Sequence, residues 1–154
     1  MSGALACIPF APEHLEAFAA APVFAADGAH ELIERGAASL AAGPAWTLCL
    51  EGRPVGCGGV VLLWPGVGEA WSLSAQGLGR HARALHRIVA ERLRAAQAGH
   101  GLHRIQASVL ADNTPGRRWL ACLGFREEGV MRGYGPLGDD FVLVARGRPA
   151  CRAA

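Results

Sequence analysis

The segment from Gln76 to His81, with the sequence QGLGRH, has the residue types and spacing of an anion-binding turn. Its two glycines allow the backbone to turn tightly and to approach a ligand closely. Free amides at the beginning of a helix, together with the positive end of the helix dipole, favour phosphate and pyrophosphate groups. Arg80 and Arg83 would add charge-assisted hydrogen bonds. A glycine turn without a ligand, in which His81 is an ordinary polar residue, is the alternative.

A second segment, from Asn113 to Phe125, combines an asparagine with a predicted helix that ends at Gly124. Asparagine is a favoured N-cap residue, and Pro115 suits the first turn of a helix. Capping and a glycine stop explain these residue types without any ligand. A helix whose asparagine also contacts a ligand is the second interpretation.

The other reactive side chains do not form a recognisable site. His100 and His103 flank a glycine and have no acidic or thiol partner nearby, so we predict no metal site. Cys122 lacks an obvious histidine and aspartate, which argues against a cysteine nucleophile. All 15 basic residues are arginine, and the absence of lysine excludes Schiff-base and P-loop chemistry.

The composition indicates one globular domain over residues 1–154, with 51% hydrophobic and 18% charged residues. A formal net charge of only +2 argues against a nucleic-acid partner. No apolar run is long enough to cross a bilayer and no signal peptide is recognisable, so we expect no membrane partner. The five cysteines are an odd number without a C-x-x-C pair, which indicates reduced thiols and a cytoplasmic location.

Hydrophobic patterns predict the elements that would position these two segments. Alternating apolar residues predict strands over residues 4–10, 46–50, 55–64, 69–74, 102–110, 125–134 and 141–146. Helical spacing predicts helices beginning at residue 12, over 29–40, over 80–98 and over 113–124. The helix between the 69–74 and 102–110 strands favours a parallel pair there. The expected fold is α/β (α+β): a mixed, mostly antiparallel sheet of about seven strands with about four helices.

The order of elements and both segments resemble the GCN5-related N-acetyltransferase (GNAT) superfamily, over roughly Trp46 to Arg148. The cofactor motif of that superfamily is Gln or Arg, two residues, Gly, one residue, then Gly or Ala. Gln76 and Gly79 match it, and His81 replaces the last small residue. The later motif of the superfamily is an Asn followed by a helix that ends in Leu-Gly-Phe, as seen here from residue 113 to 125.

A narrower likeness is to a phage-associated branch that includes acetyltransferase-like internal virion proteins. It rests on residues 68–73, 80–83 and 118–120. The cofactor loop of that branch often departs from the usual glycine pattern, as this one does. This likeness would make the protein phage-related.

The resemblance implies that acetyl-CoA, as co-substrate, lies where two central parallel strands splay apart. It implies contacts to the pantetheine arm from Leu73, Ser74, Ala75 and Asn113. It implies that the backbone N–H groups of one continuous run of residues surround the pyrophosphate, and that Arg83 adds positive charge. This run consists of Gln76, Gly77, Leu78, Gly79, Arg80, His81 and Ala82.

The resemblance also implies direct attack of a neutral amine on the thioester. A backbone N–H near Leu73 would stabilise the oxyanion, and Glu69 would accept the proton directly or through a water. Two strand periods place Glu69 and Leu73 on one face, although Glu69 could instead be an ordinary surface residue. Leu120 stands where the superfamily often has a tyrosine acid. Tyr134, the only tyrosine, could replace it or could be a half-buried strand aromatic.

The predicted function is therefore N-acetylation of a small-molecule or protein amine. The alternative is a catalytically degenerate CoA-binding or structural protein of phage or prophage origin. The acceptor has no readable motif. The oligomeric state is also open, with a homodimer as one option.

Overall fold

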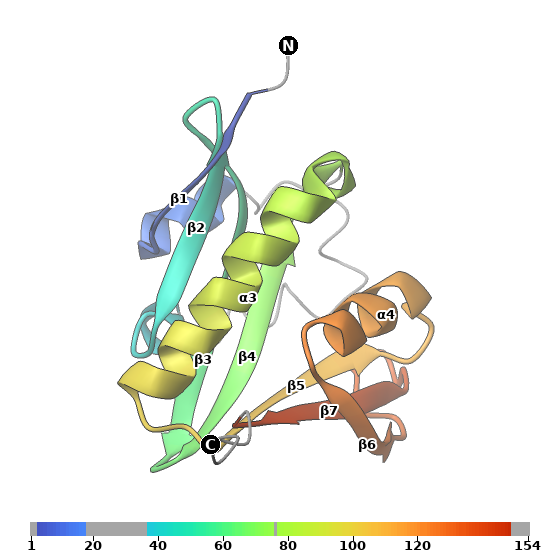
Figure 1. Ribbon diagram of the computed structural model, residues 1–154. Coiled ribbons are helices and arrows are strands. Elements are labelled where there is room, and N and C mark those ends of the chain that lie inside the picture. Colours follow the sequence, from blue (N-terminus) through green and yellow to red (C-terminus); the bar gives the residue numbers. More distant parts are fainter. Residues whose placement is uncertain (1–2, 18–36, 76, 149–154) are drawn as a thin grey trace.

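The computed structural model describes residues 3–17, 37–75 and 77–148. Its strands are β1 (Leu5–Pro9), β2 (Ala45–Leu50), β3 (Arg53–Trp64), β4 (Val67–Ser74), β5 (Arg104–Leu110), β6 (Arg126–Met131) and β7 (Phe141–Gly147). They form one seven-stranded sheet in the order β1-β2-β3-β4-β5-β7-β6 (Figure 1). All neighbouring strands are antiparallel except β4 and β5, which are parallel. The prediction of a mixed, mostly antiparallel sheet is confirmed.

The helices of the described residues are η1 (Pro12–Ala17) and η3 (Leu78–His81), both 3-10, and the α-helices α2 (Ala37–Leu40), α3 (Ala82–Gly99) and α4 (Thr114–Cys122). This part of the chain therefore has about three α-helices, where the sequence predicted about four helices. Of the helix predicted over residues 29–40, only 37–40 lie within the described residues.

Each face of the sheet has its own apolar cluster. An apolar stripe of α3 packs on one face, against a cluster that includes Trp46, Val60 and Ile105. The stripe consists of Leu85, Ile88, Val89, Leu93 and Ala96. On the opposite face, η1 and α2 cover β3 and β4. The second cluster consists of Leu15, Leu40, Cys57, Trp71 and Leu73. The sheet is thus the middle layer of the molecule.

The parallel strands β4 and β5 pair over only a short stretch. Their register comprises Val67 with Arg104, Gly68 with Ile105 and Glu69 with Gln106. Beyond that point β4 continues to Ser74 and β5 to Leu110 without pairing to each other. Each strand stays bonded to its outer neighbour, β4 to β3 and β5 to β7, so the two diverge (Figure 1). The splayed pair expected from the resemblance is present.

The beginning of the long helix differs from the prediction. Residues 78–81 form the 3-10 turn η3, and α-helical geometry starts only at Ala82. Leu78 is buried at 8% exposure, and the Arg80 N–H donates to the Gly77 carbonyl at 3.2 Å. Short 3-10 turns of this kind are frequent at the N-termini of α-helices. The hydrophobic pattern could not distinguish this turn from α-helix.

Candidate functional site

The edge of β4 that faces β5 carries unpaired backbone groups beyond Glu69. The Ala75 N–H donates to the Val55 carbonyl at 2.8 Å, so Ala75 is bonded toward β3. Residues in an antiparallel pair alternate between bonding to their partner strand and facing away from it. The amides and carbonyls of Ser72 and Ser74 therefore face β5, which no longer pairs with them. An extended ligand could bond to this edge as an added strand does.

The same alternation refines the expected oxyanion donor. Leu73 pairs with Cys57 in the register that bonds Ala75 to Val55, so its own amide faces β3. The N–H groups available near Leu73 are those of Ser72 and Ser74. The side chain of Leu73 lies in the apolar cluster on the opposite face from α3.

The turn after β4 contains a backbone conformation that favours glycine. Gly77 has φ +86°, in the left-handed region that other residues enter only with strain. A Cβ added at Gly77 or at Gly79 would meet no atom within 4 Å, so conformation and not crowding requires the glycine at Gly77. Both glycines are exposed and leave the turn accessible. Gln76, which the sequence predicted as a ligand contact, lies outside the described residues.

Within the first turn of α3 and its N-cap, the described residues include none that neutralises the positive end of the helix. The N-cap residue His81 makes no side-chain capping bond, and the first turn contains no acidic residue. Arg80, Ala82 and Arg83 are exposed there. The Arg80 and Ala82 amides are bonded within the turn, so the helix dipole and the two guanidinium groups are the features that favour an anion with several oxygens.

Asn113 is the N-cap of α4. Its Oδ1 accepts a hydrogen bond from the Gly116 N–H at 2.9 Å. A Cβ added at Gly116 would come within 2.6 Å of the Asn113 Nδ2 atom, so a larger residue there would require the Asn113 side chain to shift. The capping interpretation is confirmed, while a pantetheine contact stays a prediction. Leu120, on the same helix, is half-buried against the main core cluster.

Glu69 lies at the fork, because it is the last residue of β4 that pairs with β5. It is half-buried, and its side chain points to the face opposite α3, like those of Trp71 and Leu73. Its neighbours in register are Val61 on β3 and Gln106 on β5. The structure thus brings the carboxylate beside the edge that carries the unpaired amides.

A polar network next to Glu69 was not predicted from the sequence. The Arg104 guanidinium donates from Nη1 and Nη2 to the two carboxylate oxygens of Glu128, at 2.9 and 2.6 Å, and from Nε to Oε1 of Gln106 at 3.2 Å. Hydrogen bonding between the two side chains raises the pKa of Arg104 and lowers the pKa of Glu128. The alternation of apolar and polar residues over 102–110 was the only sequence signal that Arg104 and Gln106 share one face of a strand.

Tyr134 is not brought beside Glu69. Its ring is 57% exposed and packs edge-on against Phe141, with centroids 5.5 Å apart. Phe141 is paired with Leu110, four residues beyond Gln106 on β5, or roughly 13 Å along the strand. A direct role of Tyr134 in protonating a leaving group stays a prediction.

The described residues contain no group of three histidine, cysteine or acidic side chains that could hold a metal. Burial raises the pKa of the Cys57 thiol to about 12, so it is not a thiolate nucleophile. None of the described helices is both long and apolar enough to cross a membrane.

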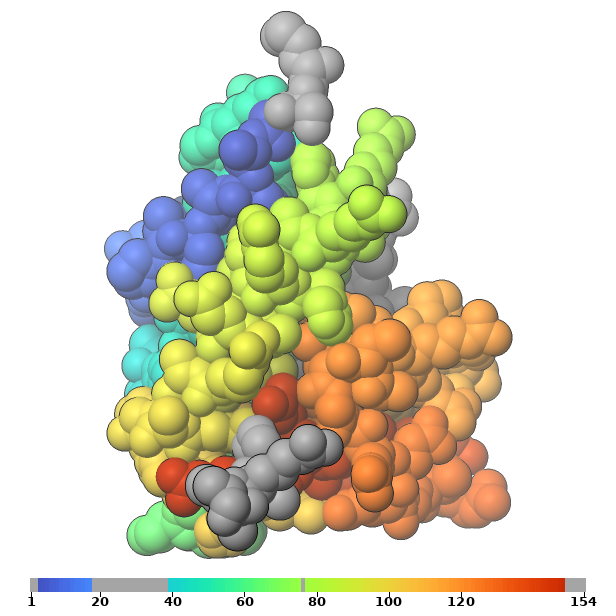
Figure 2. All heavy atoms as spheres, viewed as in Figure 1, coloured from blue at the N-terminus to red at the C-terminus, as the bar shows by residue number. Residues whose placement is uncertain are grey.

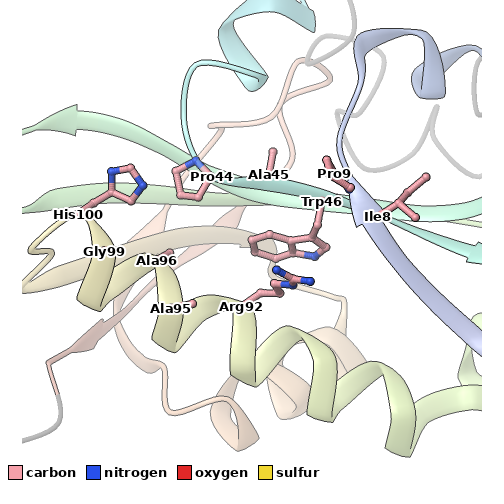
Figure 3. A pocket seen from close by; sticks show the side chains of 10 residues that line it. All are labelled: Ile8, Pro9, Pro44, Ala45, Trp46, Arg92, Ala95, Ala96, Gly99 and His100. Carbon is pink, nitrogen blue, oxygen red and sulfur yellow. The ribbon is translucent and has the colours of Figure 1, made fainter.

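A separate hollow of about 280 Å³ lies between β1, β2 and the C-terminal half of α3 (Figure 3). Trp46, Arg92 and His100 are among its lining residues. It is therefore distinct from the parted edges of β4 and β5. On the surface, α3 and α4 lie next to each other on one face of the molecule (Figure 2).

No family model matches the sequence, and no curated protein is significantly similar to it. Solved structures are similar over nearly the whole chain. An acetyltransferase of the GNAT family from Bacillus anthracis has a TM-score of 0.70 and 18% identity, covering 96% of each chain. A ribosomal-protein-alanine N-acetyltransferase from Brucella melitensis has a TM-score of 0.68 and 15% identity, covering 93% of this chain and 99% of that one.

A third similar structure is Mycobacterium smegmatis RimJ in complex with CoA-disulfide. Its TM-score is 0.64 at 24% identity, and the alignment covers 99% of this chain and 86% of that one. These similarities span the whole sheet and its helices at low sequence identity. They show that the chain has the fold of the GNAT-family acetyltransferases.

Proposed function

We propose that the protein is an N-acetyltransferase that uses acetyl-CoA and an amine acceptor. The observation that carries this proposal is the parting of β4 and β5 at Glu69, with unpaired amides along β4 and an uncapped helix start at its end. The similar structures support it, because two of them are acetyltransferases and the third is a complex with CoA-disulfide.

The chain's own groups fit acetyl-CoA in two ways. The amides and carbonyls of Ser72 and Ser74 form a free strand edge, which suits the amide-containing pantetheine arm. The turn from Gly77 to Ala82 and the guanidinium groups of Arg80 and Arg83 suit the pyrophosphate. In this proposal Leu73 and Ala75 lie beside the arm, while their own backbone groups bond toward β3. Asn113 contacts the arm through the Nδ2 atom that its cap leaves available.

In the proposed reaction, the amine nitrogen attacks the acetyl carbonyl carbon. The C–N bond forms, the C–S bond breaks, and CoA leaves as a thiolate. Glu69 takes the proton that the attacking nitrogen loses, directly or through a water. The N–H of Ser72 or Ser74 donates to the oxygen that becomes negative in the tetrahedral intermediate. Alignment of both substrates at the fork supplies much of the remaining acceleration.

Leu120 offers no hydroxyl group, so we propose that the thiolate leaves without an acid from α4. A CoA thiolate is a good leaving group, since thiols ionise near pH 8.5 while alcohols do not. Tyr134 stays the candidate acid of the sequence prediction, and a Tyr134→Phe variant tests it. Unchanged turnover in that variant would remove it from the mechanism.

The experiment for the function itself measures release of free thiol from acetyl-CoA over a panel of small amines and peptides. The proposal expects amine-dependent release and an acetylated product of the corresponding mass. It is contradicted if no amine or peptide on the panel increases thiol release above the rate of acetyl-CoA alone.

A second candidate function is CoA binding without turnover, in the protein of phage origin considered above. The observation that favours it is Leu120 in place of a tyrosine on α4. Thermal melting separates the two candidates, because a ligand bound only by the native state stabilises it by about 2.7 kcal/mol at 100 times its Kd. Stabilisation by acetyl-CoA without amine-dependent thiol release would favour this second candidate.

A further inference from the structure

We infer that Gln106 selects the acceptor by donating a hydrogen bond from its side-chain NH2 to an oxygen close to the substrate's amino group. This inference rests on the proposed function. Gln106 is the register partner of Glu69 at the last paired position of the parallel strands. Residues that pair across a sheet project from the same face, and neighbouring strands lie about 4.8 Å apart. The amide and the proposed base are therefore adjacent at the fork.

The orientation of the Gln106 amide is chemically determined. A guanidinium N–H can only donate, so the Arg104 Nε must bond to the oxygen of the amide, as observed at 3.2 Å. Arg104 is itself fixed by two hydrogen bonds to Glu128. The NH2 group of Gln106 consequently points away from Arg104, and it makes no hydrogen bond to the described residues.

The surroundings of Gln106 leave few other roles for its two N–H groups. On β7 its register partner is Ala145, which has no polar side-chain atom. On β4 its partner is Glu69, to which the structure shows no direct hydrogen bond. A carboxylate and an adjacent, oriented donor therefore face the same space. The carboxylate suits the N–H of an attacking amine, and the donor suits an oxygen of the same molecule.

This combination fits an α-aminoacyl group, meaning an amino acid, its amide or the N-terminus of a peptide. The amino nitrogen and the carbonyl oxygen are joined by three bonds of about 1.2–1.5 Å each, a separation that the two neighbouring side chains can bridge. A polyamine has no oxygen to accept from Gln106, and its second cation would lie near the Arg104 guanidinium. Sites that hydrogen-bond a substrate group discriminate against analogues that lack it.

The test compares two acceptors that differ in this oxygen, alaninamide and isopropylamine. Gln106→Leu keeps a similar volume and removes the donor. We expect it to lower kcat/KM for alaninamide about ten-fold and to leave isopropylamine nearly unchanged. Each amine is compared between the unmodified protein and the variant, so the different basicities of the two amines cancel.

Two neighbouring glutamates, Glu128 and Glu127, provide a test variant and a matched control for the contact that holds Arg104 in place. Glu128→Gln weakens the contact that orients Arg104, and we expect a decrease of about two- to three-fold for alaninamide alone. Glu127→Gln disrupts a comparable pair with Arg117, at 2.8 and 3.1 Å, that has no contact with Gln106. It should leave the ratio of the two acceptors unchanged.

The outcomes separate this inference from the proposed function. Equal losses for both amines in Gln106→Leu, or no loss for either, would overturn the selection by Gln106 while acetyl transfer stands. The same holds if the unmodified protein prefers isopropylamine. If the unmodified protein acetylates no amine or peptide, the proposed function fails, and the inference fails with it.

Discussion

Glu69, Glu127 and Glu128 carry the same carboxylate in different surroundings. Hydrogen bonds from Arg117 and Arg104 lower the pKa of Glu127 and of Glu128, respectively, and occupy both oxygens of each. A carboxylate engaged in this way is a poor proton acceptor. Glu69 instead lies half-buried at the point where the strands part. Position and available lone pairs, and not residue type, make it the candidate base.

Glu69→Gln should therefore lower kcat for acetyl transfer by about 100- to 10,000-fold, the usual contribution of a general base. The melting temperature and the KM for acetyl-CoA should change little, since the side chain keeps its size. Glu127→Gln is the control and should retain turnover. Thiol release at saturating amine measures both variants. Full activity of Glu69→Gln would show that another group, or the solvent, removes the proton.

The turn glycines differ in a way that the sequence alone does not show. Gly77 has φ +86°, whereas Gly79 does not have a positive φ, and neither position is crowded. Gly77→Ala should cost about 1–2 kcal/mol of unfolding free energy and raise the KM for acetyl-CoA, because alanine disfavours the left-handed region. Gly79→Ala should be neutral in stability. Urea unfolding measures both, and equal effects would contradict the conformational account.

At the scale of elements, the sequence could predict strands and helices but not where two strands part. The sequence pattern identified all seven strands, including β6, which is exposed along almost its whole length. The strands part after Glu69 because β4 stays paired with β3 and β5 stays paired with β7. No local sequence pattern shows where the pairing between β4 and β5 ends. The splay was therefore expected from the resemblance alone. Arg104 and Glu128 are 24 residues apart, so their pairing was equally invisible.

The α4 element depends on its cap at Asn113. Asn113→Ala removes the acceptor of the Gly116 N–H and should destabilise the protein by about 1 kcal/mol, whereas Asn113→Ser should retain most of the stability. Chemical denaturation measures this difference. A ligand role is separable, because a lost pantetheine contact would raise the KM for acetyl-CoA in Asn113→Ser as well. Equal stability of the alanine variant and the unmodified protein would contradict the capping role.

At the scale of the whole molecule, the fork between β4 and β5 lies in the central layer, between the two faces of the sheet. One face carries α3 and the main core, and the other carries Glu69 with the second cluster. In the proposed direct transfer, acetyl-CoA and the amine must be bound and aligned at the fork at the same time. Sequence reasoning predicted the mixed sheet, but not that Glu69 and Gln106 are register partners, because only the fold brings them together.

Amide hydrogen exchange followed by NMR, with and without CoA, tests the central claim most directly. Binding at the parted edge should slow exchange of the Ser72 and Ser74 amides and perturb residues 77–83. The Leu73 amide, already bonded toward β3, should change little. The account is contradicted if CoA leaves these amides unaffected, or if its effects map to the hollow around Trp46, Arg92 and His100.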